Sequence, residues 1–69
     1  MKAIDIESQV TRIPFRPFTI AVTNGDFIEV EGAADIFLPP KRTDIVVVFD
    51  KSGRMWILDV DHVSALEVR

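Results

Sequence analysis

Apolar and polar positions follow two different periods along this chain, and the change of period comes before Phe18. In the first segment Ile6, Val10 and Ile13 recur at spacings of four and three residues, which is typical of an amphipathic helix with one apolar side. From Phe18 onward every second residue is apolar, which is typical of a strand with one buried face. The pattern therefore predicts a short helix over residues 4–13, followed by strands between residues 18 and 68.

The junction between helix and strands reads IPFRPFTIAV, with two Pro-Phe pairs around one arginine. Prolines three residues apart also occur in peptides that bind aromatic grooves. However, Pro14 removes a backbone donor and disfavours helical geometry before it, and Pro17 fixes an extended entry into the first strand. We therefore predict a junction that is built into the fold and turns the helix back over the sheet.

Turn signals divide the rest of the chain into short strands. Asn24-Gly25 predicts a type I′ hairpin turn, and the segment DKSG at residues 50–53 predicts a second turn. Pro39-Pro40 cannot donate hydrogen bonds to a ladder and is expected at a sheet edge. No second helix follows, so the predicted fold is mainly β: an N-terminal helix and a five- to six-stranded antiparallel curled sheet or small barrel, forming one domain over residues 1–69.

One strand is apolar at consecutive positions, which predicts that both of its faces are covered. The strand is Ile45–Phe49, IVVVF, and the N-terminal helix or a neighbouring subunit would cover its outer face. Trp56 is hard to bury whole in a small core and is a second marker of an interface. We therefore predict a homo-oligomer, with a contact formed by Ile45, Val46, Val47, Val48, Phe49 and Trp56.

Composition and charge exclude several classes of function. The chain has 69 residues, no cysteine and a net charge of −3, so it lacks disulfides and thiolate metal ligands, and its charge disfavours wholesale binding to nucleic acid. Asp5 and Glu7 interrupt the apolar run that a secretory signal needs, and the longest apolar run is far too short for a bilayer span. We expect a cytoplasmic protein without a membrane partner.

Two local groups offer chemistry. Asp59, Asp61 and His62 would suit a metal or a general base if strand geometry placed both carboxylates on one face, but a solvated turn is the favoured interpretation. Ser64 lies too close in sequence to these residues for triad geometry. No phosphate-binding glycine motif is present. We therefore expect no catalytic residues, no metal and no cofactor.

Two resemblances add to this interpretation. The order of the PF-x-PF junction, the Asn24-Gly25 hairpin and the closing Ile57-x-Asp59-x-x-x-Val63 resembles a group of short bacterial proteins without an assigned activity, and implies a shared fold. The helix, the bent sheet, VTNGDFIEVEG and the final HVSALEV are similar to the Sm-like small barrels, which form rings and bind RNA. This second resemblance implies an Sm-like barrel and, as an alternative function, an RNA-binding ring. The candidate RNA-binding residues are Lys41, Arg42, Lys51, Arg54 and His62.

Overall fold

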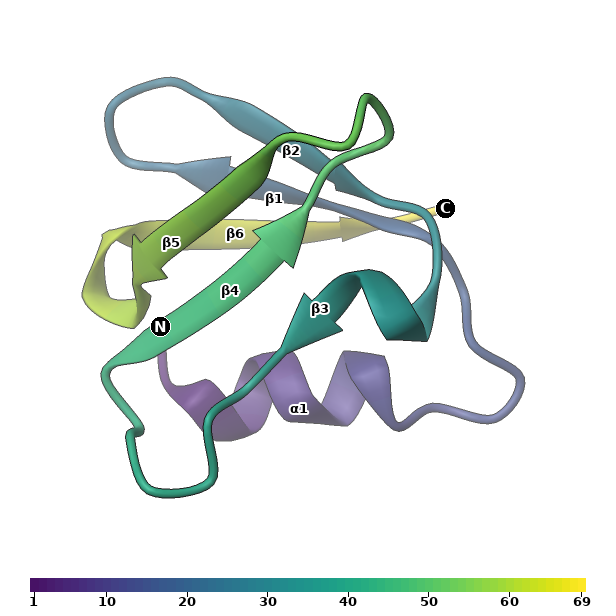
Figure 1. The fold of residues 1–69 in the computed structure, drawn as a ribbon, viewed down its shortest axis with the longest axis horizontal. Helices are drawn as coiled ribbons and strands as arrows, with labels where there is room; N and C mark the ends of the chain where they lie inside the picture. Colours follow the sequence, from purple (N-terminus) through teal and green to yellow (C-terminus); the bar gives the residue numbers. More distant parts are fainter.

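The computed structural model describes residues 1–69 as one α-helix, six β-strands and two 3₁₀ turns (Figure 1). In chain order these are α1 (Ala3–Val10), β1 (Phe18–Val22), β2 (Phe27–Val30), η1 (Ala33–Asp35), β3 (Ile36–Phe37), β4 (Ile45–Phe49), β5 (Met55–Asp59), η2 (Val60–His62) and β6 (Val63–Val68). The predicted mainly β class with one N-terminal helix is confirmed. No helix combines the length and the apolar character that crossing a membrane requires.

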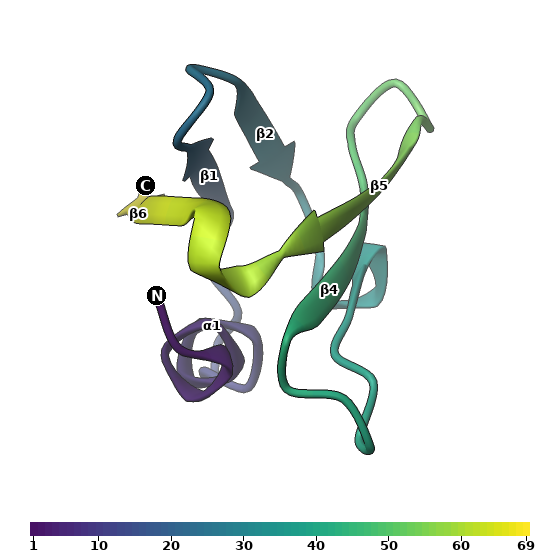
Figure 2. The same cartoon turned by 90° about the vertical axis from the view of Figure 1, so that its left-hand side faces the viewer.

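The strands form two antiparallel sheets of three strands each, in the orders β2-β1-β6 and β3-β4-β5. They do not make the single curled sheet of five or six strands that the sequence predicted, and the two sheets do not close into a barrel. The 3₁₀ turns η1 and η2 are the reason, because each interrupts the extended chain where it passes from one sheet to the other. Figure 2 shows the two sheets on different sides of the molecule, with α1 near one end of the space between them.

The helix is shorter than predicted. It ends at Val10, where the Thr11 backbone N–H and hydroxyl both donate to the Glu7 carbonyl at 2.9 Å. Ile6 is fully buried against the sheets, as the apolar spacing predicted. Ile13, which the prediction placed on the same apolar side, lies beyond the helix and is 95% exposed. Thr11 is thus the residue that caps the helix, three residues before the proline.

The junction after the helix is part of the fold. The Pro17 carbonyl accepts a hydrogen bond from the Arg69 backbone N–H at 3.1 Å, which ties the start of β1 to the end of the chain. Phe18 is fully buried, and its ring centroid lies 6.0 Å from that of the half-buried Phe15. The Pro-Phe pairs therefore anchor the chain through packing and backbone bonding.

The hairpin between β1 and β2 lies where it was predicted, but its turn type differs. The Gly25 N–H donates to the Val22 carbonyl and the Val22 N–H donates to the Asp26 carbonyl, both at 2.9 Å. Gly25 has φ +98°, whereas no residue other than glycine has a positive φ. A type I′ turn needs positive φ at both central residues, so this is instead a three-residue loop that ends in glycine. The hairpin between β4 and β5 has the same design, with Gly53 at φ +84°.

The core lies between the two sheets and consists only of apolar side chains. Its buried members are Ile6, Phe18, Ile20, Ile28, Val30, Ile36, Val46, Val48, Leu58, Val60 and Val63. On β4 the inward side chains are Val46 and Val48, both fully buried. Because side chains alternate along a strand, the remaining residues of β4 point to the opposite face of its sheet.

Candidate interaction surface

The outer face of the β3-β4-β5 sheet carries apolar side chains on all three strands. The strand register places Phe37 beside Val47 and Val47 beside Ile57, and it places Phe49 beside Met55. Each of these residues alternates with a core residue and therefore points away from the core. We call this surface the apolar face and define it as Phe37, Ile45, Val47, Phe49, Met55 and Ile57.

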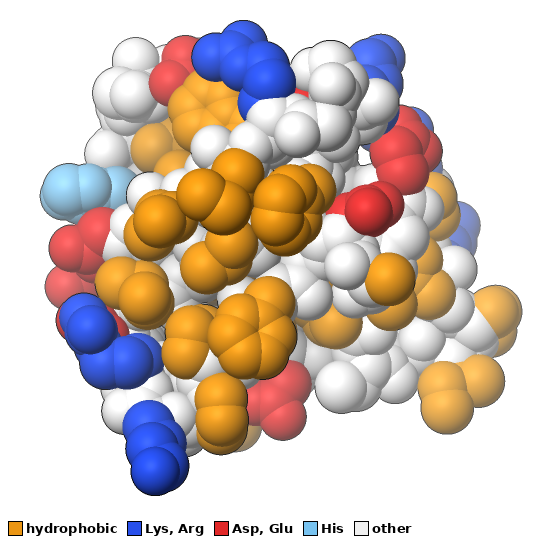
Figure 3. Space-filling view, viewed as in Figure 1, with side chains coloured by type: hydrophobic (Ala, Val, Ile, Leu, Met, Phe, Trp, Pro, Cys, Tyr) orange, Lys and Arg blue, Asp and Glu red, His pale blue; other side chains and the backbone are white.

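The apolar face is open to solvent. Its four most exposed members, Phe37, Phe49, Met55 and Ile57, are exposed by 42% to 63%. Figure 3 shows hydrophobic side chains gathered over β3, β4 and β5, with charged side chains around the margin of this area. Single exposed apolar residues are ordinary, but a contiguous apolar area rimmed by polar groups marks an interaction site.

The same sheet has an open edge at β5. The Val60 N–H donates to the Asp44 carbonyl and the Asp50 N–H donates to the Arg54 carbonyl, which fixes the hydrogen-bonded pairs of the β4-β5 ladder. Since these pairs alternate, the backbone groups of Ile57 at the centre of β5 point away from β4. The β5 edge therefore carries backbone groups without a strand partner, next to the exposed side chain of Ile57.

The structure divides the residues that the sequence assigned to the interface between two faces. Ile45, Val47 and Phe49 lie on the apolar face, where a second molecule can reach them. Val46 and Val48 lie in the core with no exposed surface. A contact through β4 therefore uses only the first set, because the inward side chains are already covered by this chain's own residues.

Trp56 packs on the inner side of β5 and is half-buried. Its Nε1–H donates to Asp50 Oδ2 at 2.9 Å, and the Arg54 guanidinium lies 5.4 Å from its ring centroid. Asp50 also accepts hydrogen bonds from Ser52, through the backbone N–H at 2.9 Å and the hydroxyl at 2.8 Å. These bonds hold the pKa of Asp50 well below its ordinary value, and the bond from Trp56 has the largest effect. The indole therefore has a polar partner within the chain.

The candidate RNA-binding residues do not gather in one place on a single chain. Lys41 and Arg42 lie in the loop between β3 and β4, whereas Lys51 and Arg54 lie at the β4-β5 hairpin, at the other end of β4. His62 is in η2. A five-residue strand is about 17 Å long, so the two basic groups are well separated.

Two of these basic residues already have acidic partners. The Arg42 guanidinium donates to both carboxylate oxygens of Asp44, at 2.8 and 2.7 Å, which raises the pKa of Arg42 and lowers that of Asp44. Lys51 Nζ lies 3.0 Å from Glu29 Oε2. Such pairing reduces the positive charge available to a phosphate.

Asp59, Asp61 and His62 do not form the site that strand geometry suggested. Asp61 lies in η2 instead of β5, and its backbone N–H donates to Asp59 Oδ1 at 2.9 Å, so Asp59 caps the 3₁₀ turn. No group of three or more His, Asp or Glu side chains is arranged to hold a metal ion. The Ser64 hydroxyl donates to the Ala21 carbonyl at 3.0 Å and is not directed at His62.

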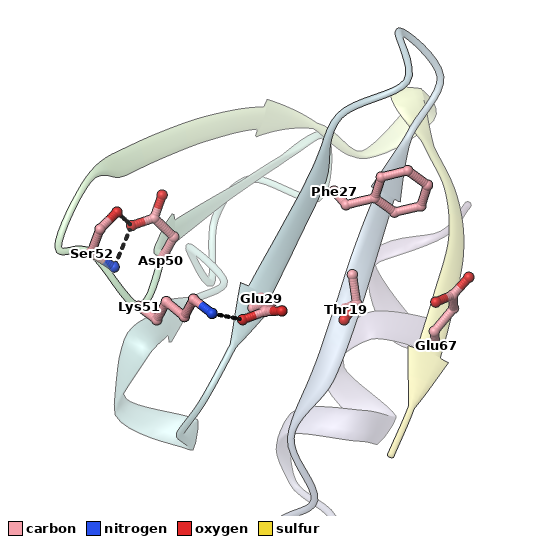
Figure 4. Close-up of a pocket in the computed structure, with 7 residues that line it drawn as sticks. All are labelled: Thr19, Phe27, Glu29, Asp50, Lys51, Ser52 and Glu67. Atoms are coloured by element: carbon pink, nitrogen blue, oxygen red, sulfur yellow. Dashed lines mark hydrogen bonds and ion pairs between the residues drawn. The ribbon is translucent and has the colours of Figure 1, made fainter.

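An open pocket of about 620 Å³ lies between the outer face of β2-β1-β6 and the β4-β5 hairpin (Figure 4). Its lining residues are Thr19, Phe27, Glu29, Asp50, Lys51, Ser52 and Glu67. Glu29 forms an ion pair with Lys51 and a second one with Arg69, whose guanidinium lies 3.5 Å from Glu29 Oε1. These contacts lower the pKa of Glu29, and the contact with Lys51 has the larger effect. In the same pocket the Ser52 hydroxyl donates to Asp50 Oδ1 at 2.8 Å.

Sequence reasoning missed half of the apolar face, namely Phe37, Met55 and Ile57. A signal was present, because MWIL in β5 is apolar at consecutive positions just as Ile45–Phe49 is. The two-residue length of β3 hid Phe37, since a strand that short shows no alternation.

Comparisons of this chain with models of protein families, with curated proteins and with solved structures give no match in any of the three.

Proposed function

We propose that this protein is a non-enzymatic assembly or binding module that acts as a homo-oligomer through its apolar face. The observation that carries this proposal is the exposure of Phe37, Phe49, Met55 and Ile57 on one uninterrupted surface of three strands. Such a surface is costly to leave in water and invites aggregation unless a partner covers it. The cysteine-free chain of 69 residues also has a small core of its own, so association would add stability.

The size of the surface fits this proposal. Large apolar side chains present about 150–250 Å² each when free, so the four exposed ones leave roughly 400 Å² in water. At about 25 cal/mol per Å², covering that area contributes about 10 kcal/mol from each copy. Two copies together exceed the estimated cost of association, which is of the order of 4–15 kcal/mol.

Sedimentation velocity on the wild type and two matched variants tests the proposal. Ile57→Thr places a hydroxyl at the centre of the apolar face and keeps a β-branched side chain suited to a strand. Ile13→Thr makes the same change at a residue that is 95% exposed and lies outside the apolar face. We expect the wild type and Ile13→Thr to associate equally, and Ile57→Thr to associate at least about tenfold more weakly.

A wild type that remains monomeric at micromolar concentration would contradict the proposal. So would equal association of all three proteins, because the contact would then lie away from the apolar face. Circular dichroism spectra of the three proteins establish that each is folded before association is compared.

An Sm-like ring that binds RNA is the alternative that the sequence suggested. It requires Lys41 and His62 from several copies to repeat around an axis, because one chain does not gather its basic residues. A filter-binding assay with short RNAs at low salt separates the two functions. If the wild type retains RNA on the filter and Lys41→Ala does not, the RNA-binding ring is favoured. If the wild type retains no RNA, the assembly module is favoured.

A further inference from the structure

We infer that two copies of this chain pack their apolar faces together about a two-fold axis. The axis lies between the two faces and is parallel to β4, and charged residues at one end of each face pair across the contact. This inference rests on the function proposed above and adds the stoichiometry, the orientation and the polar contacts of the complex. It is carried by the area of the apolar face and by the placement of the charged residues beside it.

The area favours a second copy of the same face. The exposed part of the apolar face, roughly 400 Å², is about a tenth of the 4467 Å² accessible surface of the chain. A specific interface covers about a tenth of a small protein's surface on each partner. Two apolar faces in contact remove about 800 Å² from water, and a specific interface of about 1,200–2,000 Å² also requires the residues at their margin to be covered.

Unpaired charges of opposite sign flank one end of the apolar face. Lys41 lies in the loop before β4, on the β3 side of the sheet, and Asp61 follows β5 on the other side. Neither residue takes part in any ion pair within the chain, and Asp59 beside Asp61 takes part in none. In the view of Figure 3 basic side chains lie at the lower left of the apolar area, acidic side chains and the histidine lie to its left, and a further acidic side chain lies below it.

These charges select the direction of the axis. A two-fold axis along β4 places the β5 side of one copy over the β3 side of the other at the same end, so that Lys41 of each copy faces Asp61 of the second copy. An axis across the strands would instead place Lys41 near the β4-β5 hairpin of the second copy. Opposite charges at the margin of an interface fix its orientation, so the first arrangement is favoured.

The apolar rows fit the same arrangement. Phe37, Val47 and Ile57 form one row across the sheet, with Val47 on the central strand. The axis along β4 places Phe37 of one copy over Ile57 of the other, and Val47 over its own equivalent. Strand directions in the two sheets then stay nearly aligned, which is the usual geometry for sheets packed face to face.

Reversal of the charges tests this arrangement by sedimentation equilibrium on the full chain. Lys41→Glu should weaken the dimer about tenfold at about 0.01 M salt, because two attractive contacts become repulsive. Lys41→Glu combined with Asp61→Lys should restore affinity to within about threefold of the wild type, because each contact is attractive again. Asp59 is left unchanged, since it caps η2.

Two controls make the result specific. Arg12→Glu changes the net charge by the same amount at an exposed residue that follows α1, and it should leave the dimer unchanged. At about 1 M salt the effect of Lys41→Glu should vanish while that of Ile57→Thr persists, because salt screens exposed charges and leaves apolar contact intact.

A trimer or larger ring would overturn the two-fold arrangement, and so would a double variant that remains as weak as Lys41→Glu alone. In both cases the proposed function survives if Ile57→Thr still dissociates the complex. A monomeric wild type, or an Ile57→Thr variant that associates normally, would overturn the arrangement and the proposed function together.

Discussion

Asp50 is the residue on which the β4-β5 hairpin depends most, because its carboxylate accepts four hydrogen bonds, from Ser52, Arg54 and Trp56. These bonds favour the charged form and hold the pKa of Asp50 below its ordinary value of 3.8 in the folded state. The stabilisation is therefore complete above the ordinary pKa, and it is lost as the pH falls toward the lower pKa of the folded state.

We expect Asp50→Asn to lower the free energy of unfolding at pH 7, because the amide N–H₂ that replaces one carboxylate oxygen cannot accept the hydrogen bonds made to that oxygen. The difference from the wild type should shrink as the pH falls below about 3.8, since the wild type loses its carboxylate contacts there. Urea unfolding followed by circular dichroism from neutral to acidic pH measures this. Glu7→Gln is the control, because Glu7 is exposed and its carboxylate takes part in no hydrogen bond or ion pair. A difference that stays constant down to acidic pH would contradict the role given to the charge.

At the scale of elements, each hairpin depends on one glycine with a positive φ. Gly53→Ala should destabilise the protein by about 1–2 kcal/mol, which is the cost of a left-handed conformation for a residue with a Cβ. A Cβ at Gly53 would meet no atom within 4 Å, so the backbone alone determines the cost. Gly53→Asn should cost less, because asparagine tolerates this conformation.

Gly32→Ala is the matched control for that measurement. Gly32 has φ −147°, which any residue adopts, and its added Cβ would meet the Asp35 carboxylate only at an ordinary distance of 3.5 Å. Urea denaturation of the three variants gives the comparison. Equal destabilisation by Gly53→Ala and Gly32→Ala would show that conformation at positive φ is not the cause.

The helix depends on one buried side chain, because an eight-residue helix is unstable alone. Ile6→Ala should cost about 2–5 kcal/mol, a large part of the total stability of a domain this small, whereas Ile6→Val should cost about 0.5–1.5 kcal/mol. Ile4→Ala, at a helix residue that is 66% exposed, should change stability by less than about 0.5 kcal/mol. Similar costs for Ile6→Ala and Ile4→Ala would mean that α1 is not docked on the core.

The elements also show what local sequence can and cannot predict. The places of the hairpins followed from Asn24-Gly25 and Gly53, because turn chemistry is local. The turn type at Asn24 and the end of the helix at Thr11 did not, because single hydrogen bonds decide between geometries with similar preferences. The division into two sheets depends on η1 and η2, whose backbone has no strong signal. Of the apolar face, the sequence predicted the residues on β4, because Ile45–Phe49 is apolar at consecutive positions. It did not predict Ile57, because the strand register that places Ile57 beside Val47 joins segments that are apart in the sequence.

At the scale of the whole molecule, the two sheets have different outer faces. The outer face of β2-β1-β6 carries charged residues, among them Glu29, whose ion pairs to Lys51 and Arg69 join it to other parts of the chain. The outer face of β3-β4-β5 is apolar and has no covering element of its own. A chain with one solvated sheet and one uncovered sheet is suited to form a closed pair, in which the solvated sheets face water.

If association covers the apolar face, folding and association are coupled, and the midpoint of thermal unfolding should rise with protein concentration. A hundredfold increase in concentration is worth about 2.7 kcal/mol per dimer, which is about 1.4 kcal/mol per chain and raises the midpoint by about 9 °C for a domain of this size. Ile57→Thr, which associates more weakly, should show a smaller rise over the same range, while Ile13→Thr should follow the wild type. Differential scanning calorimetry over such a range measures all three proteins. A midpoint that rises equally in Ile57→Thr and in the wild type would place the contact on another surface.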